Sequence, residues 1–304
     1  MANIRNELEY INEMARSDPA ALVVRSEERY RNIVAGIAKQ AVETHGHKLV
    51  LLAGPSASGK TTTAELLAKS MKAGGINAYR ISLDDFYYES ADIPLLPDGT
   101  PDIESVHALD LPLIRSTMRE LMLCGRAGIP HFKFSTGSRS RWDSLEIGAD
   151  DVIILEGLHA LNPEISAHVP DSVKVYVSVS SRIYDEKRNI IFNKRGLRLV
   201  RRILRDSQFR GASAEDTVLM WPAVTLGEET WLAPCKQYAD VLINSIHIYE
   251  PCVFRTRVLP LLEAIPPDSP AYMESRRAAK ALRKFTPLPE EFVPSDSLLR
   301  EFLG

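Results

Sequence analysis

The sequence predicts an α/β fold in which helices cover both faces of a doubly wound, parallel β-sheet. Three observations support this prediction: short apolar runs of strand length, helical segments that alternate with them, and a glycine-rich turn between the first strand and its helix. Continuous apolar runs are typical of strands that are buried on both faces. With 304 residues, 45% of them apolar, the chain can bury a large core in one domain or in one domain with appendages.

Five segments have the length and apolar character of buried strands. They are, in chain order, KLVLLAG from Lys48, AYRISLDD from Ala78, DDVIILEG from Asp150, SVKVYVSV from Ser172 and ADVLIN from Ala239. The segments between them that have helical periodicity are AELLAKSMKAGG, LPLIRSTMRELMLCG and LRLVRRILRDSQF. The first two end at glycines, which commonly stop a helix.

Both ends of the chain are predicted to be helical. Residues 1–46 carry apolar side chains at helical spacing, for example Ile33, Ile37 and Ala41. They contain no catalytic signature, so we interpret them as a helical cap on the core. After residue 250 the chain is helical again, with a break at PPDSP and then a basic helix, ESRRAAKALRKF.

The composition argues against some classes of partner. A net charge of −3 gives no general attraction to nucleic acid or to a membrane surface. No apolar run reaches the roughly 18 residues of a membrane span, and the first residues contain no signal-peptide core. Cys124, Cys235 and Cys252 lie far apart, which fits a reducing compartment better than a disulfide framework. We therefore expect a cytoplasmic protein with neither nucleic-acid nor membrane partners.

Residues 54–61 read GPSASGKT and fit the phosphate-loop pattern G-x-x-x-x-G-K-[ST], between a predicted strand and a predicted helix. Glycines let successive N–H groups turn toward a phosphate, and the helix N-terminus adds its dipole. In this arrangement Lys60 reaches the β- and γ-phosphates, and the Thr61 hydroxyl binds Mg²⁺. The motif predicts a nucleoside triphosphate site formed by Gly54, Ser56, Ala57, Ser58, Gly59, Lys60, Thr61 and Thr62.

Two predicted strands end in acids, at the edge of a parallel sheet where ligands bind. Asp84 lies in SLDDFY and Glu156 ends VIILE. Phosphoryl transfer needs a carboxylate near the acceptor hydroxyl and others that hold Mg²⁺, so Asp84 suits the first role and Glu156 the second. Asp84 with Asp85 would equally suit a turn or a helix cap. A charge at the end of an apolar run is harder to explain by structure alone.

The segment RLVRRILRDSQFRG places Arg198, Arg201, Arg202 and Arg205 three or four residues apart, on one face of a helix. Such a face can be merely solvated. Its flanks are not basic enough for a nucleic-acid stripe. The sharper hypothesis is a lid that closes over the triphosphate, donates hydrogen bonds to the transferred group and excludes water.

Four blocks together resemble the uridine kinase/phosphoribulokinase family of P-loop kinases, in its divergent bacterial uridine-kinase-like branch. They are GPSASGKTT, SLDDFY, IPHFKFSTGSR with ADDVIILEG, and RLVRRILRDSQFRG with APCKQYADVLIN. The last pair matches the "RL-x-RR-x-x-RD-x-x-x-RG" and "P-x-K-x-YAD" patterns of uridine kinases without gaps. The combination is more specific than any one block.

The resemblance implies transfer of the γ-phosphoryl group of ATP, with Mg²⁺, to a hydroxyl of a small molecule, in the first place a nucleoside. It implies that Asp84 is the catalytic carboxylate, and that Lys60, Arg202 and Arg205 stabilise the transferred group. The oxygen ligands of Mg²⁺ are expected to be Thr61, Asp84 and Glu156, and the lid is expected at about residues 196–215. Arg201 and Arg210 of this lid are expected to contact ATP.

On the acceptor side the resemblance implies a pocket formed by Asp84, Tyr87, Asp102 or Glu104, Phe132, Arg139, His159 and Arg198. The spacing to Asp110 favours Glu104 over Asp102. His159 is equally compatible with a hydrogen-bonded core histidine. A homo-oligomer is compatible with the family.

The sequence departs from the family where the acceptor is recognised. Uridine–cytidine kinases present a tyrosine and, five residues later, a histidine to the pyrimidine, whereas this chain has Phe132 and Gly137. Phe132 can stack on a ring, but Gly137 has no side chain with which to read one, which reduces discrimination. The alternatives are therefore a non-nucleoside acceptor (pantothenate, a polyol, a sugar or a sugar phosphate) and a nucleotide-dependent switch or binding module without an acceptor. The predicted organisation is a helical extension over 1–46, a kinase core over 47–249 and a helical segment over 250–304.

Overall fold

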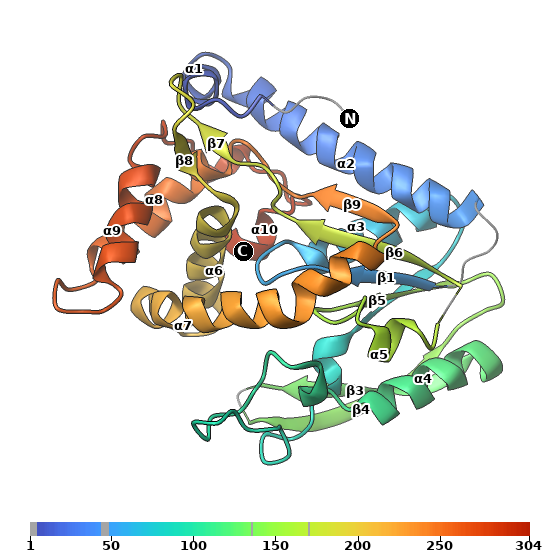
Figure 1. The fold of residues 1–304 in the computed structure, drawn as a ribbon. Helices are drawn as coiled ribbons and strands as arrows, with labels where there is room; N and C mark the ends of the chain where they lie inside the picture. Colours follow the sequence, from blue (N-terminus) through green and yellow to red (C-terminus); the bar gives the residue numbers. More distant parts are fainter. Residues whose placement is uncertain (1–4, 44–48, 135, 170) are drawn as a thin grey trace.

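A five-stranded parallel β-sheet lies at the centre of the molecule, with helices on both sides of it (Figure 1). The computed structural model describes residues 5–43, 49–134, 136–169 and 171–304. The strands lie in the order β2 (Ala78–Ser82), β5 (Val152–Glu156), β1 (Leu49–Ala53), β6 (Ser172–Ser178) and β9 (Val241–Asn244). This order, with β1 in the middle and every neighbouring pair parallel, confirms the doubly wound sheet. Residues 1–4 and 44–48, which belong to the predicted N-terminal extension and the start of the first strand, lie outside the described residues.

The side chains of the sheet alternate between two hydrophobic cores, as the pleat of a strand requires. Val50 and Ile154 face a core that is closed by α1–α3 and α6–α10. Leu51 and Leu155 face a second core, on the side of α4. Because both faces are covered, the strands read as continuous apolar runs rather than as alternating ones.

Helices α4 and α6 begin or end at residues that are local sequence signals. Asn193 caps α6 by accepting a hydrogen bond from Gly196 N at 2.7 Å, and Asp110 caps α4 in the same way. Gly125, in the left-handed region with φ of +69°, ends α4. The helices are α1 (Leu8–Ser17), α2 (Pro19–Glu43), α3 (Lys60–Ala73), α4 (Leu111–Cys124), α5 (Pro163–Ser166), α6 (Lys194–Phe209), α7 (Ala214–Gly227), α8 (Glu250–Glu263), α9 (Tyr272–Leu282) and α10 (Arg300–Leu303).

The sheet brings the predicted site residues to one edge. The phosphate loop follows β1, and Glu156 is the last residue of the neighbouring β5, in register with Leu52 of β1. On its other side Glu156 is in register with Ser82, the last residue of β2. Asp84 follows Ser82 in a short 3₁₀ turn, η1 (Leu83–Phe86). The carboxyl ends of three adjacent strands therefore meet at the loop.

The structure contains elements that the sequence analysis did not predict. An antiparallel hairpin, β3 (Arg126–Lys133) with β4 (Ser138–Glu146), projects below the sheet beside α4 in Figure 1. A second small hairpin pairs β7 (Ile183–Tyr184) with β8 (Ile190–Phe192). Helix α7 continues into a π-helical turn, η3 (Glu228–Leu232).

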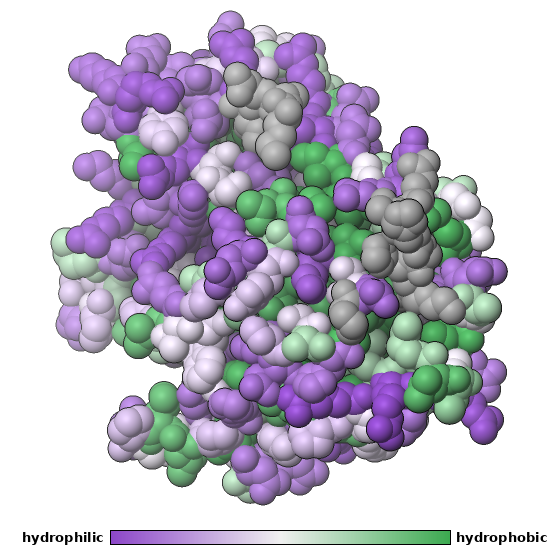
Figure 2. All heavy atoms as spheres, turned by 45° about the vertical axis from the view of Figure 1, so that its right-hand side comes forward, coloured by the Kyte–Doolittle hydropathy of each residue, from purple (hydrophilic) through white to green (hydrophobic). Residues whose placement is uncertain are grey.

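Both terminal extensions pack into the main core. Residues of α1, α2, α8, α9 and α10 share one hydrophobic cluster with β1 and β6. In the described ranges, no helix combines the length and the apolar character needed to cross a membrane. Hydrophilic side chains cover much of the face drawn in Figure 2, and apolar ones form smaller patches between them.

Candidate active site

The phosphate loop is a tight turn between the end of β1 and the first turn of α3. Ala57 and Gly59 both have left-handed backbone conformations, with φ of +56° and +90°. Such residues turn successive N–H groups toward the same side, as anion-binding loops require. A Cβ atom at Gly59 would lie 2.4 Å from Leu298 Cδ1, so a side chain there would collide with the C-terminal segment. The structure thus brings the predicted triphosphate-binding residues together in one turn.

Two side chains of the loop lie beside Glu156 at the end of β5. Thr61 Oγ1 donates a hydrogen bond to Glu156 Oε1 at 3.5 Å, and Arg80 Nη1 lies 3.1 Å from the same oxygen. Lys60 Nζ donates to Pro55 O at 3.3 Å, and its positive charge acts on Glu156. Glu156 is only 4% exposed. A charge at the end of a buried strand is therefore held by the loop and by a neighbouring strand.

Burial and nearby carboxylates make this region electrostatically unusual. Burial, with a smaller contribution from the charge of Asp84, raises the pKa of Glu156 to about 7, and Lys60 and Arg80 oppose the shift. Asp84 itself is exposed on η1, where its N–H donates to Ser82 Oγ at 3.3 Å. Carboxylates gathered at a phosphate loop are stabilised by a cation.

The residues present fit a Mg²⁺ ion that arrives with a triphosphate. In the part of the chain that the structure describes, no group of three or more His, Cys, Asp and Glu side chains could hold a metal ion. Mg²⁺ does not need such a group, because it retains water and binds phosphate oxygens with one or two protein oxygens. The Thr61 hydroxyl and the Glu156 carboxylate supply these, with Asp84 nearby.

Three arginines at the C-terminal end of α6 surround Asp206. Nε of Arg202 and Nε of Arg205 each lie 3.1 Å from its carboxylate, and Arg210 Nε lies 3.6 Å from it. Arg202 also donates to the hydroxyl of Ser56 at 3.0 Å, so the cluster lies against the phosphate loop. Nη2 of Arg205 is buried without a hydrogen-bond partner among the described residues. Three guanidinium groups share one carboxylate, and this excess of positive charge suits a phosphoryl group.

Arg198 and Arg201 take positions that differ from their predicted roles. Arg198 forms an ion pair with Glu228 at 2.5 Å, and its Nε donates to Ser56 O at 2.8 Å, so its donors are directed at protein groups rather than at an acceptor. Arg201 is fully buried, pairs with Glu250 at 2.5 Å and donates to two carbonyl groups of the loop. Both side chains support the loop from within the protein.

The predicted mobile lid over residues 196–215 also differs from the structure in its first half. Leu199, Val200, Ile203 and Leu204 are buried in the main core. These contacts fix α6 against the sheet. Only the cluster around Asp206 retains the geometry expected of a lid, because it presents arginines to the loop.

On the acceptor side, the two predicted acids, Asp102 and Glu104, lie close together but have different surroundings. Burial raises the pKa of Glu104 to about 7, and the charges of Glu228 and Asp84 add to this, while Arg202 and Lys60 oppose it. Glu104 therefore lies among the charges of the site, as the spacing favoured.

The second predicted acid and the predicted histidine lie close to Glu104. Asp102 lies in the preceding turn, where its N–H donates to Pro94 O at 2.8 Å. His159 Nε2 lies 3.0 Å from the carbonyl oxygen of Glu104. Burial lowers the pKa of His159 to about 4, so the imidazole is neutral. The histidine is thus buried next to the site and holds the backbone of the Glu104 segment.

Aromatic side chains lie beside these acids. Tyr87 and Phe132 have ring centroids 5.7 Å apart, and Phe134, which was not predicted, lies 5.6 Å from Tyr87 and 5.1 Å from Phe132. Such a cluster offers faces on which a ring or an apolar body can stack. Arg139 Nη2 donates to Asp110 Oδ2 at 2.8 Å, which ties the hairpin to the start of α4.

Gly137 is closely covered by Ser90. Its φ is +63°, and a Cβ atom placed on it would lie 2.0 Å from Ser90 Oγ. A larger residue here would need both a strained backbone and a displaced Ser90. In this conformation the Ser90 hydroxyl fills the space that a side chain at position 137 would take.

Several functional positions were not identified from the sequence. Glu228 accepts a hydrogen bond from Ser56 N at 2.7 Å, in addition to its pairing with Arg198. Glu301 contacts Thr62. No motif marks either residue, because each reaches the loop from a segment that is remote in sequence. Asp206 lies within the segment RLVRRILRDSQFRG. Its position among arginines was the sequence signal that could have identified it.

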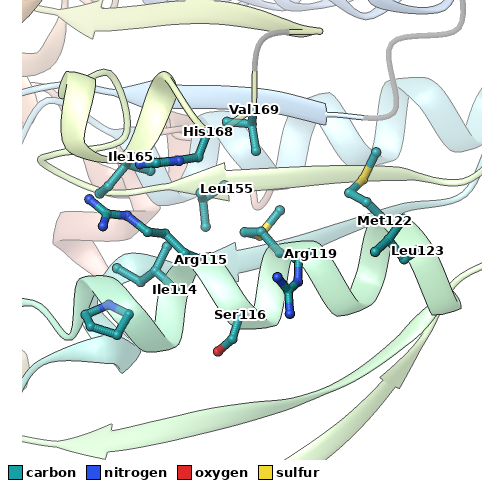
Figure 3. Close-up of a pocket in the computed structure, with 12 residues that line it drawn as sticks. Ile114, Arg115, Ser116, Arg119, Met122, Leu123, Leu155, Ile165, His168 and Val169 are labelled. Carbon is teal, nitrogen blue, oxygen red and sulfur yellow. The ribbon is translucent and has the colours of Figure 1, made fainter.

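A cavity lies away from the predicted site residues. It has a volume of about 590 Å³ between α4 and residues 155–169, and Figure 3 shows the side chains that line it. Its lining is mostly apolar, with Arg115, Arg119 and His168 as the basic groups. None of the predicted site residues lines this cavity.

The comparisons with known proteins identify the family of the chain. The sequence matches the family described as Phosphoribulokinase / Uridine kinase over residues 49–250. A uridine kinase of Deinococcus deserti is 28% identical over 204 residues, which cover 66% of this chain and 89% of that protein. A uridine kinase of Lactobacillus helveticus is 26% identical over 196 residues, which cover 64% of this chain and 85% of that protein.

Solved structures were compared as well. A D-glycerate 3-kinase from Cryptococcus neoformans aligns with a TM-score of 0.46 at 16% identity, over 67% of this chain and 89% of that one. A structure described as a possible uridine kinase from Bacillus stearothermophilus aligns with a TM-score of 0.47 at 19% identity, over 70% of this chain and 98% of that one. Because the family match extends over more than half of the chain, the protein belongs to the Phosphoribulokinase / Uridine kinase family.

Proposed function

We propose that this protein is an ATP-dependent kinase that transfers the γ-phosphoryl group of ATP to a hydroxyl group of a nucleoside. The observation that carries the proposal is the meeting of Thr61 with Glu156 at 3.5 Å, beside Lys60 and within electrostatic reach of Asp84. A triphosphate site next to an exposed carboxylate is the arrangement that phosphoryl transfer to an alcohol needs.

The proposed mechanism assigns each group one task. The acceptor oxygen attacks the γ-phosphorus, the bond from phosphorus to the ADP oxygen breaks, and the Asp84 carboxylate takes the proton of the hydroxyl. Lys60 and the arginines around Asp206 donate hydrogen bonds to the phosphoryl oxygens, where negative charge is spread in the transition state. Thr61 and Glu156 would hold Mg²⁺, which would supply positive charge to the phosphates of the bound triphosphate.

Three observations support a nucleoside as the acceptor. The curated relatives reported above are uridine kinases, and the alignments include most of their length. Tyr87, Phe132 and Phe134 form an aromatic cluster on which a base can stack. Glu104 suits the binding of ribose hydroxyls, because a partly buried carboxylate accepts hydrogen bonds from vicinal OH groups.

One observation favours a second candidate, a kinase of the same family that acts on a non-nucleoside alcohol. Gly137 has no side chain, and the space that one would need is taken by Ser90 Oγ. A pyrimidine would then lose a polar partner that related kinases provide. A polyol, a sugar, a sugar phosphate or pantothenate would not require that partner.

The test is ATP consumption by the purified protein with Mg²⁺, measured with each acceptor class and without any acceptor. Stimulation by nucleosides well above the control supports the proposed acceptor. Stimulation by one of the other alcohols supports the second candidate. The Asp84→Asn variant, prepared in the same way, must lose the stimulation, because activity that survives in it would come from a contaminating kinase. If no acceptor stimulates turnover, the kinase proposal fails and a nucleotide-dependent switch remains.

A further inference from the structure

The C-terminal segment reaches the phosphate loop at the point where a nucleotide must bind. Thr62 Oγ1 donates to Glu301 Oε2 at 2.9 Å, and Thr62 N lies 3.4 Å from the same oxygen. Three residues earlier, Leu298 packs against Gly59. These residues lie beyond position 250, where the family match ends. The loop is therefore covered by a segment that the family itself does not define.

The N–H group that faces Glu301 is one that phosphates use. Thr62 is the third residue of α3, and the first N–H groups of a helix have no partner within it. In phosphate loops these groups, with the amides before them, hold the α- and β-phosphates. The Glu301 carboxylate thus occupies an anion position of the loop, as a phosphate oxygen would.

The Glu301 carboxylate and a triphosphate would compete for the same position at the phosphate loop. The Glu301 charge acts on Glu156 in the same direction as that of Asp84, so these carboxylates repel one another. A triphosphate at the loop adds further negative charge. The N–H group of Thr62 can point at the Glu301 carboxylate or at a bound α-phosphate, but not at both.

The structure also provides room for the carboxylate to move. Glu301 lines a cavity of about 400 Å³ beside the loop, together with Lys69 and Arg300. Lys69 is a cation on the surface, 3.7 Å from Asp296 and 73% exposed. A displaced carboxylate would therefore find space and positive charge close to its present position.

We propose that Glu301 acts as a displaceable occupant of the phosphate loop, which nucleotide must remove from Thr62 in order to bind, and that it thereby sets the affinity for the donor. This inference rests on the proposed ATP-dependent function. The competing explanation is a passive cap that only stabilises the start of α3.

The experiment compares the wild-type protein with Glu301→Gln in the binding of ADP with Mg²⁺, measured by calorimetry. The amide keeps the shape and can still accept from Thr62, but the charge is gone. We expect roughly 2- to 30-fold tighter binding, the range given by a charge at a helix N-terminus. Glu65→Gln is the matched control, because Glu65 is an exposed acid that lines the same cavity but does not contact the loop amide. It should change the affinity much less.

Equal or weaker binding by Glu301→Gln, or an equal gain in Glu65→Gln, overturns the proposal. If Glu301→Gln does not fold, hydrogen exchange of the wild-type chain decides: amides of residues 299–304 exchange faster with ADP and Mg²⁺ under displacement, and slower or equally under a passive cap. A wild-type protein that binds no nucleotide at all would refute the proposed function, and this inference with it.

Discussion

Asp84 and Glu156 follow adjacent strands, but their surroundings give them different chemistry. Asp84 is exposed on a turn, whereas Glu156 is 4% exposed and contacts Thr61 and Arg80. An exposed carboxylate can approach an incoming hydroxyl, and a buried one is better suited to a cation. The difference in burial is the physical basis for assigning the two roles.

The Asp84→Asn variant tests the first role. The amide cannot take the proton of the acceptor, so kcat should fall by about 10²- to 10⁴-fold. Affinity for ADP with Mg²⁺ should change little, because the loop and the arginine cluster remain intact. Steady-state kinetics and calorimetry on the same preparation separate the two effects. Wild-type turnover in this variant would show that Asp84 is not the proton acceptor.

The Glu156→Gln variant tests the second role through pH and stability. Burial raises the pKa of Glu156 to about 7, above its value of about 4.3 in the unfolded chain. A raised pKa gives stability that is complete below the unfolded pKa and is lost as the pH rises through about 7. Glu156→Gln removes this loss, so the ligand-free variant should melt a few degrees higher than wild type at pH 8. At pH 5 the two should differ much less.

The same change should weaken nucleotide binding in the presence of Mg²⁺, because the neutral amide is a poorer ligand for the cation. The stability prediction is tested by calorimetric melting curves of Glu156→Gln and wild type at pH 5 and pH 8, with the exposed Glu146→Gln as control. A lower melting temperature at pH 8 in Glu156→Gln would contradict the assigned electrostatics. A higher melting temperature would make this region an instance of a site that is destabilised by its function.

At the scale of elements, helix α6 separates what sequence can reveal from what it cannot. Its periodicity predicted the helix and the shared face of its arginines. The same pattern could not show which arginines are buried, because Glu228 and Glu250 come from later segments. Burial of Arg201 against Glu250 turned an expected lid contact into a fixed support of the loop.

The pair of Arg201 and Glu250 leads to a prediction about the stability of the protein. Arg201→Met leaves Glu250 as a buried charge without its partner, so unfolding free energy should fall by about 3–5 kcal/mol. The control is Arg195→Met in the same helix, since Arg195 is 56% exposed and pairs with the equally exposed Glu229. It should change stability by less than about 1 kcal/mol. Urea denaturation of both variants provides the measurement, and equal losses would refute the special role of Arg201.

The hairpin of β3 and β4 shows a different limit of sequence reasoning. Most side chains of β4 are exposed, including that of Trp142. The segment therefore has no apolar run that would indicate a buried strand. By contrast, the five central strands are buried on both faces and were visible in the sequence. The motif residues of the loop and the acids were predictable because they are adjacent to those strands. Glu228 and Glu301 were not, because only the folded chain brings them to the loop.

At the scale of the whole molecule, the two terminal extensions belong to the same core as the sheet. Glu27 of α2 accepts hydrogen bonds from Tyr249 and from Ser297, each at 2.5 Å. Tyr249 precedes α8, and Ser297 immediately precedes Leu298, which covers the loop. Glu27 thus connects the N-terminal extension to the C-terminal segment that lies on the phosphate loop.

Glu27→Ala tests whether the extensions act as one unit with the site. The change removes the acceptor that two buried hydroxyl groups share and leaves them to contact each other at 3.4 Å, beside His247, whose pKa burial lowers so far that it stays neutral. Each unsatisfied group costs about 1–3 kcal/mol, so a total loss of about 2–5 kcal/mol is expected. The adjacent and exposed Glu28→Ala should stay within about 0.5 kcal/mol of wild type.

The location of the loss matters as much as its size. If Glu27 links the extensions, hydrogen exchange in Glu27→Ala should accelerate in residues 290–304 as well as in α2, because Ser297 loses its anchor. If the extension were an independent cap, exchange would accelerate in α2 alone, and the C-terminal segment would keep its protection. That second pattern would separate the N-terminal extension from the site. The first would mean that the helices at both ends of the chain help to hold the C-terminal segment against the phosphate loop.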